Sequence, residues 1–289
     1  MPRAVTPPAA DIADQVAAAL AEDIGSGDLT ASLIPQATQI TATLICRQAA
    51  ILCGSDWLCE TFRQCDNSID ITAHFEDGDC ILPQATLFTL HGPARAILSG
   101  ERTALNFIQT LSATATTTAN YVAALKGYPT TLLDTRKTIP GLRLAQKYAV
   151  ACGGGSNHRI GLFDALLIKE NHILAAGSIT AAINAARKRY QQRFLLEVEV
   201  ETLTQLDEAI AAHVDRVLLD NMDIATIGAA VARSAGRVKL EASGGVTLKS
   251  ITALAATGVD YISVGSLTKG IDPIDLSLRV VNFKSVNEG

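Results

Sequence analysis

Beyond Gly127 the chain alternates between short runs of β-branched and aliphatic residues and longer Ala- and Leu-rich stretches with a helical pattern. Polar or glycine residues close each short run, and the ends of the later runs recur about 22 residues apart. This spacing leaves room for one strand and one helix, so it predicts parallel strands joined by helical crossovers. The predicted strands are 131–134, 165–169, 194–199, 216–220, 238–241 and 261–264.

Two architectures share this alternation, namely a doubly wound open sheet and a closed or nearly closed barrel. No dinucleotide-binding GxGxxG motif follows the first strand, and a set of six or so strands is typical of a barrel. The pattern therefore favours a parallel α/β barrel.

The first half of the chain has a different pattern. An Ala-rich amphipathic stretch at 11–21 predicts a helix, and the glycines and aspartates of 22–30 predict its end and a turn. Segments 40–53 and 69–91 alternate like strands, with a helix predicted between them at 56–65. A long helix at 100–124 is predicted to lead out of this small α+β domain.

Composition agrees with two domains and narrows the list of partners. The 289 residues are 48% hydrophobic and 18% charged, which indicates a large core. A net charge of -5 gives no attraction for nucleic acid. The chain has no run of 18 apolar residues, and 1–10 lack the features of a secretory signal. We expect a cytoplasmic protein that binds neither nucleic acid nor membrane.

The six cysteines form no CxxC pair, and the chain is long and rich in aliphatic residues. A disulfide framework or a zinc site is therefore disfavoured. We expect reduced, mostly buried thiols at Cys46, Cys53, Cys59, Cys65, Cys80 and Cys152.

In a parallel barrel the reactive residues lie at the C-terminal ends of the strands. The early strand ends and the glycine-rich segment 152–159 carry cations that would together form an anion-binding wall, whereas a single such cation is more often part of a surface ion pair. The guanidinium of arginine matches carboxylates and phosphates particularly well. The candidate residues are Arg136, Lys137, His158, Arg159, Lys169 and His172.

Carboxylates follow on the middle strands. Glu199 and Asp220 would hold Mg²⁺ directly or through water, beside a pyrophosphate, or would stabilise a cationic sugar. Alternatively, each balances Lys137 or Lys169 without touching a ligand. Glu197, Glu199 and Glu201 share one face of their strand, so the pattern leaves open which of them serves the site.

Small residues close the last two strands. Segments 243–245 and 264–266 contain glycines, which permit the backbone to approach a phosphate closely. Either segment alone is more often a plain turn. Together, the cations, carboxylates and glycine segments fit phosphoribosyl transfer to an acidic heterocycle.

Several segments closely resemble the signature of quinolinate phosphoribosyltransferases. They are EDIGSGDLT at 22–30, GERTALNF at 100–107, DTRKTIPGLR at 134–143, GGGSNHR at 153–159, IKENH at 168–172, EVEVE at 197–201 and ISVGSLT at 262–268. The resemblance covers nearly the whole chain.

The resemblance implies a fold with an N-terminal α/β sandwich domain and an incomplete parallel α/β barrel. The expected boundaries are 1–113 for the sandwich, 114–272 for the barrel and 273–289 for a segment that returns to the first domain. It also implies a homodimer in which the partner subunit's Arg102 enters each active site.

The implied reaction transfers the phosphoribosyl group of phosphoribosyl pyrophosphate to quinolinate, with loss of CO₂, to give nicotinate mononucleotide for NAD biosynthesis. It implies Mg²⁺ at Glu199 and Asp220 and no organic cofactor. The resemblance assigns catalysis to Lys137, Lys169, Glu199 and Asp220.

The quinolinate carboxylates are expected at Arg102, Arg136, Arg159 and Lys169, with Lys137, His158 and His172 in support. The resemblance also assigns Thr135 to substrate binding. It assigns the 5-phosphate of phosphoribosyl pyrophosphate to Ser243, Gly244, Gly245, Val264, Gly265 and Ser266.

Two other functions are compatible with parts of this pattern. One is a phosphoribosyltransferase-like protein associated with molybdenum transport, which the intact segments 157–159 and 169–172 disfavour. The other is a non-catalytic sensor of pyridine carboxylates or sugar phosphates. A sensor would be expected to lack Glu199 or Asp220, and this chain has both.

Overall fold

The computed structural model describes residues 5–284, and its chain divides into two compact units. The described part of one unit consists of 119–138 and 155–269. The other consists of 5–118, 139–154 and 270–284. Among the described residues, no helix is both long enough and apolar enough to cross a membrane.

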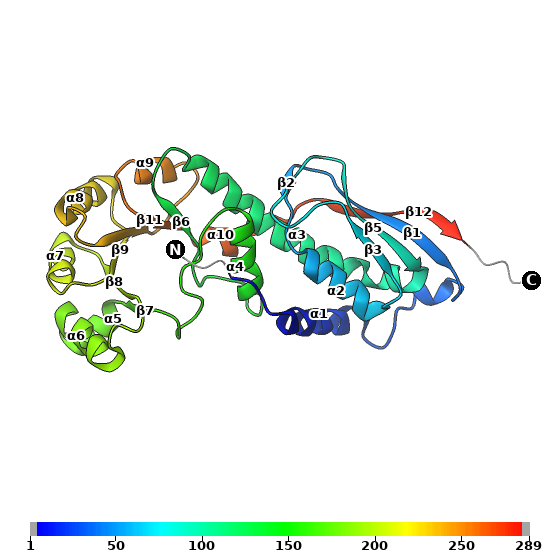
Figure 1. Ribbon diagram of the computed structural model, residues 1–289, viewed down its shortest axis with the longest axis horizontal. Helices are drawn as coiled ribbons and strands as arrows, with labels where there is room; N and C mark the ends of the chain where they lie inside the picture. Colours follow the sequence, from blue (N-terminus) through cyan, green and yellow to red (C-terminus); the bar gives the residue numbers. More distant parts are fainter. Residues whose placement is uncertain (1–4, 285–289) are drawn as a thin grey trace, which may run out of the picture. The chain divides into compact units, whose positions relative to one another are not determined.

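The first of these units is built on six parallel strands in the order β6-β11-β10-β9-β8-β7 (Figure 1). Strands β7 to β11 lie side by side in chain order, and β6 pairs with β11 at the other edge of the sheet. A doubly wound sheet would instead reverse its order at a switch point. The strands are β6 (Thr131–Leu133), β7 (Leu166–Ile168), β8 (Leu196–Val200), β9 (Arg216–Asp220), β10 (Lys239–Ser243) and β11 (Tyr261–Ser263).

Strands β6 and β7 form the two edges of this sheet, so the barrel is incomplete, as the family resemblance implied. Helices α5 to α9 pack side by side along the outer face of the sheet, and α10 follows β11 (Figure 1). Thr202 and Asp223 cap two of them directly after β8 and β9. The helices are α5 (Glu170–Ala176), α6 (Ile179–Tyr190), α7 (Leu203–Ala211), α8 (Ile224–Ser234), α9 (Ile251–Ala255) and α10 (Ser266–Lys269).

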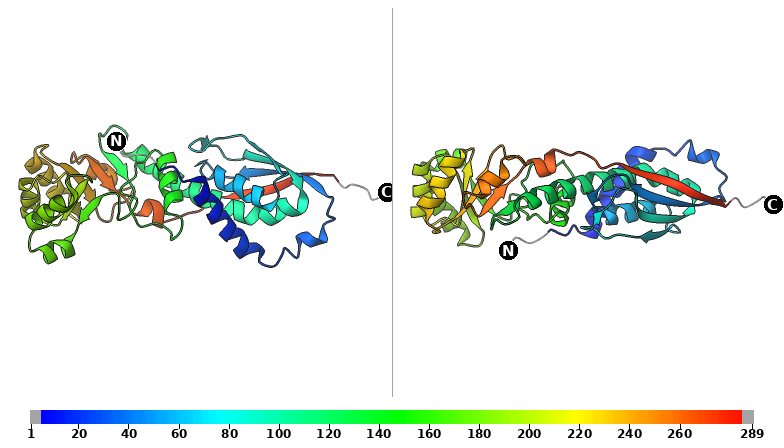
Figure 2. Two further views of the ribbon diagram at one scale, coloured as in Figure 1. Left: turned by 60° about the horizontal axis from the view of Figure 1, so that its bottom comes forward. Right: turned by 90° about the horizontal axis from the view of Figure 1, so that it is seen from above.

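The second unit is an α/β sandwich. Its four-stranded antiparallel sheet has the order β12-β1-β5-β3, and β12, from the far end of the chain, lies beside β1 (Figure 2). Buried and half-buried residues alternate along β1, and the buried ones pack against α2 and α3. The strands are β1 (Gln39–Cys46), β2 (Ala50–Ile51), β3 (Asp70–Ala73), β4 (Cys80–Ile81), β5 (Ala85–Pro93) and β12 (Leu276–Lys284).

The helices of this unit enclose a second cluster of buried residues. Trp57 lies at its centre and packs with apolar side chains of α1, α3 and α4. The helical segments are α1 (Ala9–Ile24), the short 3₁₀ helix η1 (Ala31–Leu33), α2 (Ser55–Cys65), α3 (Ala94–Ala124) and α4 (Arg143–Cys152).

The predicted start of the long helix at Gly100 was wrong, because α3 begins at Ala94. A Cβ atom at Gly100 would lie 3.0 Å from Cys65 Sγ and 3.1 Å from Phe62 Cδ1. The glycine therefore allows α2 and α3 to pack closely and marks no helix boundary.

Candidate active site

A cavity of about 380 Å³ lies at the C-terminal ends of the six parallel strands, and every strand or its following loop contributes to its wall. Cations and carboxylates dominate this wall. The lining residues are Thr135, Arg136, Lys137, His158, Arg159, Leu167, Lys169, Glu199, Leu218, Asp220, Asn221, Glu241, Ser243, Gly244, Gly245 and Ser263.

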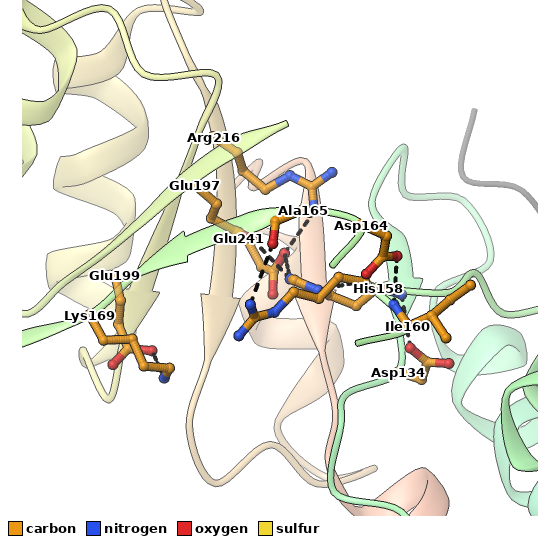
Figure 3. Close-up of polar contacts among 11 residues, drawn as sticks. Asp134, His158, Ile160, Asp164, Ala165, Lys169, Glu197, Glu199, Arg216 and Glu241 are labelled. Atoms are coloured by element: carbon orange, nitrogen blue, oxygen red, sulfur yellow. Dashed lines mark hydrogen bonds and ion pairs between the residues drawn. The ribbon is translucent and has the colours of Figure 1, made fainter. Parts of the chain in front are cut away.

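Lys169 and Glu199 form an ion pair on this wall, from the end of β7 to the inner face of β8 (Figure 3). The lysine is half exposed, whereas the glutamate is mostly covered. The sequence left open whether Glu199 pairs with a lysine or meets a ligand. In the structure it pairs with Lys169 and also lines the cavity.

Asp220 faces the same cavity from the end of β9, and its Oδ2 accepts a 2.8 Å hydrogen bond from Asn221 Nδ2. Burial and the negative charge of Glu199 raise the pKa of Asp220, although Lys169 and Lys137 oppose the shift. A bound cation would favour the charged form of Asp220 and oppose this shift. Their hard oxygen donors fit Mg²⁺.

His158 lines the cavity and points its Nε2 toward two buried carboxylates (Figure 3). Its Nε2 is 2.9 Å from Glu197 Oε2 and 3.5 Å from Glu241 Oε2. Arg216 Nη1 donates a 3.0 Å hydrogen bond to Glu241 Oε2. Burial lowers the pKa of His158, but the two carboxylates outweigh that effect and raise it to about 9. The imidazole is therefore positively charged at neutral pH.

The loop that carries His158 is held by buried hydrogen bonds. Asp134, which is fully buried, accepts a 2.7 Å bond from Asn157 Nδ2 and a 2.8 Å bond from the His158 backbone N–H. Asp164 accepts bonds of 2.7 and 2.9 Å from the backbone of Ile160 and Gly161. The glycine-rich segment is thus an ordered support for the site.

Two guanidinium groups, those of Arg136 and Arg159, share the cavity wall with the charged histidine. Burial and repulsion from Arg136 lower the pKa of Arg159. Arg136 Nε is buried and has no hydrogen-bond partner within residues 5–284. An anion bound in the cavity would satisfy this donor and relieve the repulsion between the two cations.

The backbone turn at 243–245 requires glycine. Gly244 has φ +105°, and a Cβ there would lie 2.1 Å from Asn221 Oδ1. Gly245 has φ +59°, the left-handed region that favours glycine. The turn therefore keeps its backbone open to the cavity.

Several predicted residues do not line the cavity. Val264 is buried, Ser266 begins α10, and a Cβ at Gly265 would lie 2.9 Å from Lys137 Cδ, so this glycine makes room for the lysine stem. His172 is exposed, and its Nδ1 accepts a 3.0 Å hydrogen bond from the Lys169 backbone N–H. Arg102 is exposed on the part of α3 that belongs to the sandwich unit.

The sequence interpretation missed Glu241 and Asn221 and did not select Glu197. A glutamate inside the otherwise apolar core of β10 was the available signal for Glu241, because a buried charge in a strand needs a partner. Asn221 gave a weaker signal through its position directly after Asp220.

Comparison with known proteins decides the family. The model of the quinolinate phosphoribosyl transferase N-terminal domain matches residues 28–112, and that of the C-terminal domain matches 114–279. The chain belongs to the quinolinate phosphoribosyltransferase family. Both domains of the family are therefore present in this chain.

Relatives of this phosphoribosyltransferase are similar over nearly their whole length. A probable nicotinate-nucleotide pyrophosphorylase (carboxylating) of Bacillus subtilis is 43% identical. The match covers 92% of this chain and 93% of the Bacillus protein. A quinolinate phosphoribosyltransferase (decarboxylating) of Nicotiana glauca is 36% identical. The match covers 94% of this chain and 83% of the Nicotiana protein.

A solved structure of the same fold supports the comparison. The nicotinate-nucleotide pyrophosphorylase of Francisella tularensis superimposes with a TM-score of 0.94 at 50% identity. The superposition covers 97% of this phosphoribosyltransferase and 99% of the Francisella chain.

Proposed function

We propose that the protein transfers the phosphoribosyl group of phosphoribosyl pyrophosphate to quinolinate, producing nicotinate mononucleotide, pyrophosphate and CO₂. The observation that carries the proposal is one cavity lined by cations on the early strands, carboxylates on the middle strands and a glycine turn after β10. The names of these two relatives, one carboxylating and the other decarboxylating, describe this reaction in its opposite directions.

Quinolinate is a dianion, and the cationic side of the cavity suits it. Arg136, Arg159 and the protonated His158 converge there, and Lys169 lines the adjacent wall. Arginine side chains bind carboxylates through paired hydrogen bonds, which would fix the plane of the pyridine ring. Fixing the ring directs its nitrogen at the sugar carbon.

The glycine turn suits the 5-phosphate of the sugar. Gly244 and Gly245 line the cavity, and both have positive φ angles that residues with a side chain rarely adopt. Their backbone N–H groups are the donors we assign to the phosphate oxygens. Lys137, whose carbonyl accepts a 2.7 Å hydrogen bond from Thr268, lies exposed at the cavity edge and would meet the pyrophosphate.

Transfer of the sugar develops positive charge at its anomeric carbon as pyrophosphate leaves. Glu199 and Asp220 are held on neighbouring strands before the reaction, so their negative charges would stabilise an oxocarbenium-like transition state without rearrangement. The ion pair with Lys169 holds Glu199 in place. These residues are our candidates for catalysis.

Decarboxylation follows from the first step. Once the pyridine nitrogen carries ribose, the ring is a pyridinium and accepts the electron pair left when the adjacent carboxylate departs as CO₂. The arginines would hold the remaining carboxylate during this step. No organic cofactor is required by this chemistry.

Mg²⁺ is part of the proposal. Glu199 and Asp220 would hold it, directly or through water, and its chemistry there would be charge neutralisation of the pyrophosphate. Burial and the neighbouring Glu199 raise the pKa of Asp220, which supports a cation at this place that would favour its charged form.

We also propose a homodimer in which the partner subunit's Arg102 completes each site. Arg102 is exposed, and so are Leu162, Phe163 and Leu174, with 72%, 73% and 81% of their surface accessible. These three apolar residues lie in the two segments that flank β7. Large exposed apolar side chains beside a site are typical of a surface that another chain covers. A cytoplasmic location stays a prediction from the sequence.

The direct test is an assay of purified protein with quinolinate, phosphoribosyl pyrophosphate and Mg²⁺. We expect nicotinate mononucleotide, and we expect Lys169→Met to abolish it while Lys188→Met, on the exposed end of α6, retains activity. Absence of the nucleotide at every enzyme concentration would overturn the proposal. Equal activity of the Lys169→Met variant would overturn the site assignment.

A further inference from the structure

Two thiols that do not line the cavity lie together within the sandwich unit. Cys53 Sγ, Cys152 Sγ and a carboxylate oxygen of Asp77 all lie within 4.8 Å of one another. Cys53 is fully buried, whereas Cys152, the last residue of α4, is partly exposed. Both cysteines are reduced in the structure. We propose that Cys53 and Cys152 form a reversible intramolecular disulfide when the protein meets a peroxide.

A metal ion is the competing explanation for such a cluster, and Asp77 argues against it. Its Oδ1 accepts hydrogen bonds from the Ser55 backbone N–H and hydroxyl, at 3.1 and 2.6 Å. Its Oδ2 accepts bonds from the Gly54 N–H and the Tyr148 hydroxyl, at 3.0 and 3.1 Å. Four donors occupy this carboxylate, which is engaged in holding the start of α2. The two thiols remain as partners for each other.

The backbones that carry the two thiols are firmly placed. The Cys53 N–H donates a 2.9 Å hydrogen bond to Ser112 Oγ, and the Ser112 hydroxyl donates one of 3.1 Å to the Cys53 carbonyl. After Cys152, a Cβ at Gly153 would lie 2.3 Å from the Ala115 carbonyl oxygen, so α4 ends tightly against α3. With the two Sγ atoms already within 4.8 Å of each other, bond formation requires them to approach to the S–S distance of about 2 Å.

The two cysteines differ in a way that assigns their roles. The hydrogen bond from the Cys53 thiol lowers the pKa of Cys152, and partial exposure admits a small oxidant. Burial raises the pKa of Cys53 well above the ordinary value. Cys152 is therefore the thiol that reacts with peroxide, and Cys53 is the resolving thiol.

The chemistry balances with hydrogen peroxide as the oxidant. The Cys152 thiolate attacks one peroxide oxygen, the O–O bond breaks, and the products are a sulfenic acid and water after one proton is taken up. Cys53 sulfur then attacks the Cys152 sulfur, the S–O bond breaks, and a second water leaves. Two thiols and one peroxide yield one disulfide and two waters. A dithiol reductant reverses the oxidation.

Cys152 is adjacent in sequence to a segment that contributes to the cavity. Cys152 directly precedes the segment 153–159, which carries His158 and Arg159 to the cavity wall. A disulfide at Cys152 would therefore form directly before the segment that carries these two residues.

The test treats the purified full-length protein with hydrogen peroxide, blocks remaining thiols and digests with trypsin. We expect the intact protein to lose two hydrogens and peptide 48–63 to be linked to peptide 148–159, both reversed by dithiothreitol. Because peptide 48–63 also contains Cys59, the link must persist in Cys59→Ser. It must disappear in Cys152→Ser, while the exposed Cys80→Ser is the matched control.

Other outcomes would overturn the proposal. These are a sulfinic acid at Cys152 with no link, a link that involves Cys59, or links only between chains. Stoichiometric Zn²⁺ binding that protects both thiols would also overturn it, since the cluster would then be a metal site. The readout is the mass of peptides and does not depend on the enzyme's activity, so it is separate from the proposed function.

Discussion

His158 Nε2 lies 2.9 Å from Glu197 Oε2, and both side chains are shielded from solvent. This contact is a large part of why the pKa of His158 is raised to about 9. A raised histidine pKa stabilises the folded protein fully below its ordinary value of about 6.5 and loses that effect as pH rises through about 9.

The first prediction follows from that sign. Because the protonated His158 would bind quinolinate, we expect the KM for quinolinate to rise as pH increases through 9. In Glu197→Gln, which loses the charge but keeps the shape, the pKa of His158 should fall by about one unit or more. NMR titration of the imidazole, assigned with His158→Asn, measures the shift.

The matched control is Glu201→Gln, because Glu201 lies on the same face of the chain after β8 and is exposed. It should leave the His158 titration unchanged. A pKa of His158 that is the same in Glu197→Gln and in the native protein would contradict the role of the carboxylate.

The second prediction concerns Gly244. Gly244→Ala places a Cβ 2.1 Å from Asn221 Oδ1 and forces a side chain into φ +105°. We expect it to cost about 1–3 kcal/mol of stability and to raise the KM for phosphoribosyl pyrophosphate at least tenfold. Chemical denaturation and steady-state kinetics measure the two effects.

Gly236→Ala separates the two causes. Gly236 also has a positive φ, +74°, but no atom lies within 4 Å of an added Cβ. This control should lose about 1 kcal/mol through backbone strain alone and should keep the native KM. An equal rise in KM in both variants would contradict a phosphate site at 243–245.

The third prediction concerns Asp220, whose folded-state pKa is raised by burial and by Glu199. The protonated carboxyl group is favoured in the folded protein, so its contribution to stability is present at low pH and is lost as pH rises through the folded pKa. At neutral pH the charged carboxylate therefore lowers the free energy of unfolding. Asp220→Asn should therefore have a melting temperature equal to or above that of the native protein. It should lose about 100-fold or more in kcat and the stimulation by Mg²⁺.

Asp207→Asn is the control for this variant, because Asp207 forms an exposed ion pair with Arg233. Its activity and Mg²⁺ dependence should be native. An Asp220→Asn protein with native kcat and unchanged Mg²⁺ stimulation would show that this carboxylate has no part in the reaction.

Periodicity placed the strands well because apolar runs end abruptly at polar residues. The predicted strand 216–220 is β9 itself, and the predicted end of β6 was one residue too long. Gly100 was misinterpreted because a glycine needed for helix packing has the same sequence signal as one at a helix boundary.

The sequence found the cations and carboxylates at the strand ends but not the contacts beneath them. Alternation placed Glu197 and Glu199 on one face, and only their depth separates them, with 1% and 15% of the side chains exposed. Glu241 reaches His158 from a different strand, a contact that depends on the curvature of the sheet and has no local pattern.

The fourth prediction tests the shared site. Arg102→Ala and Lys169→Ala should each be nearly inactive, but each hybrid dimer would contain one site with both residues intact. After random exchange, equal mixtures should regain about one quarter of the native activity. Absence of recovery, despite exchange shown by native mass spectrometry, would contradict a site shared between subunits.

The central claim is tested most directly with quinolinate carrying ¹³C in its 2-carboxylate. In the presence of phosphoribosyl pyrophosphate and Mg²⁺, labelled CO₂ should appear in equal amounts with nicotinate mononucleotide, and omission of phosphoribosyl pyrophosphate should prevent both. Formation of the nucleotide from nicotinate without labelled CO₂ from quinolinate, or release of labelled CO₂ without the nucleotide, would contradict the account.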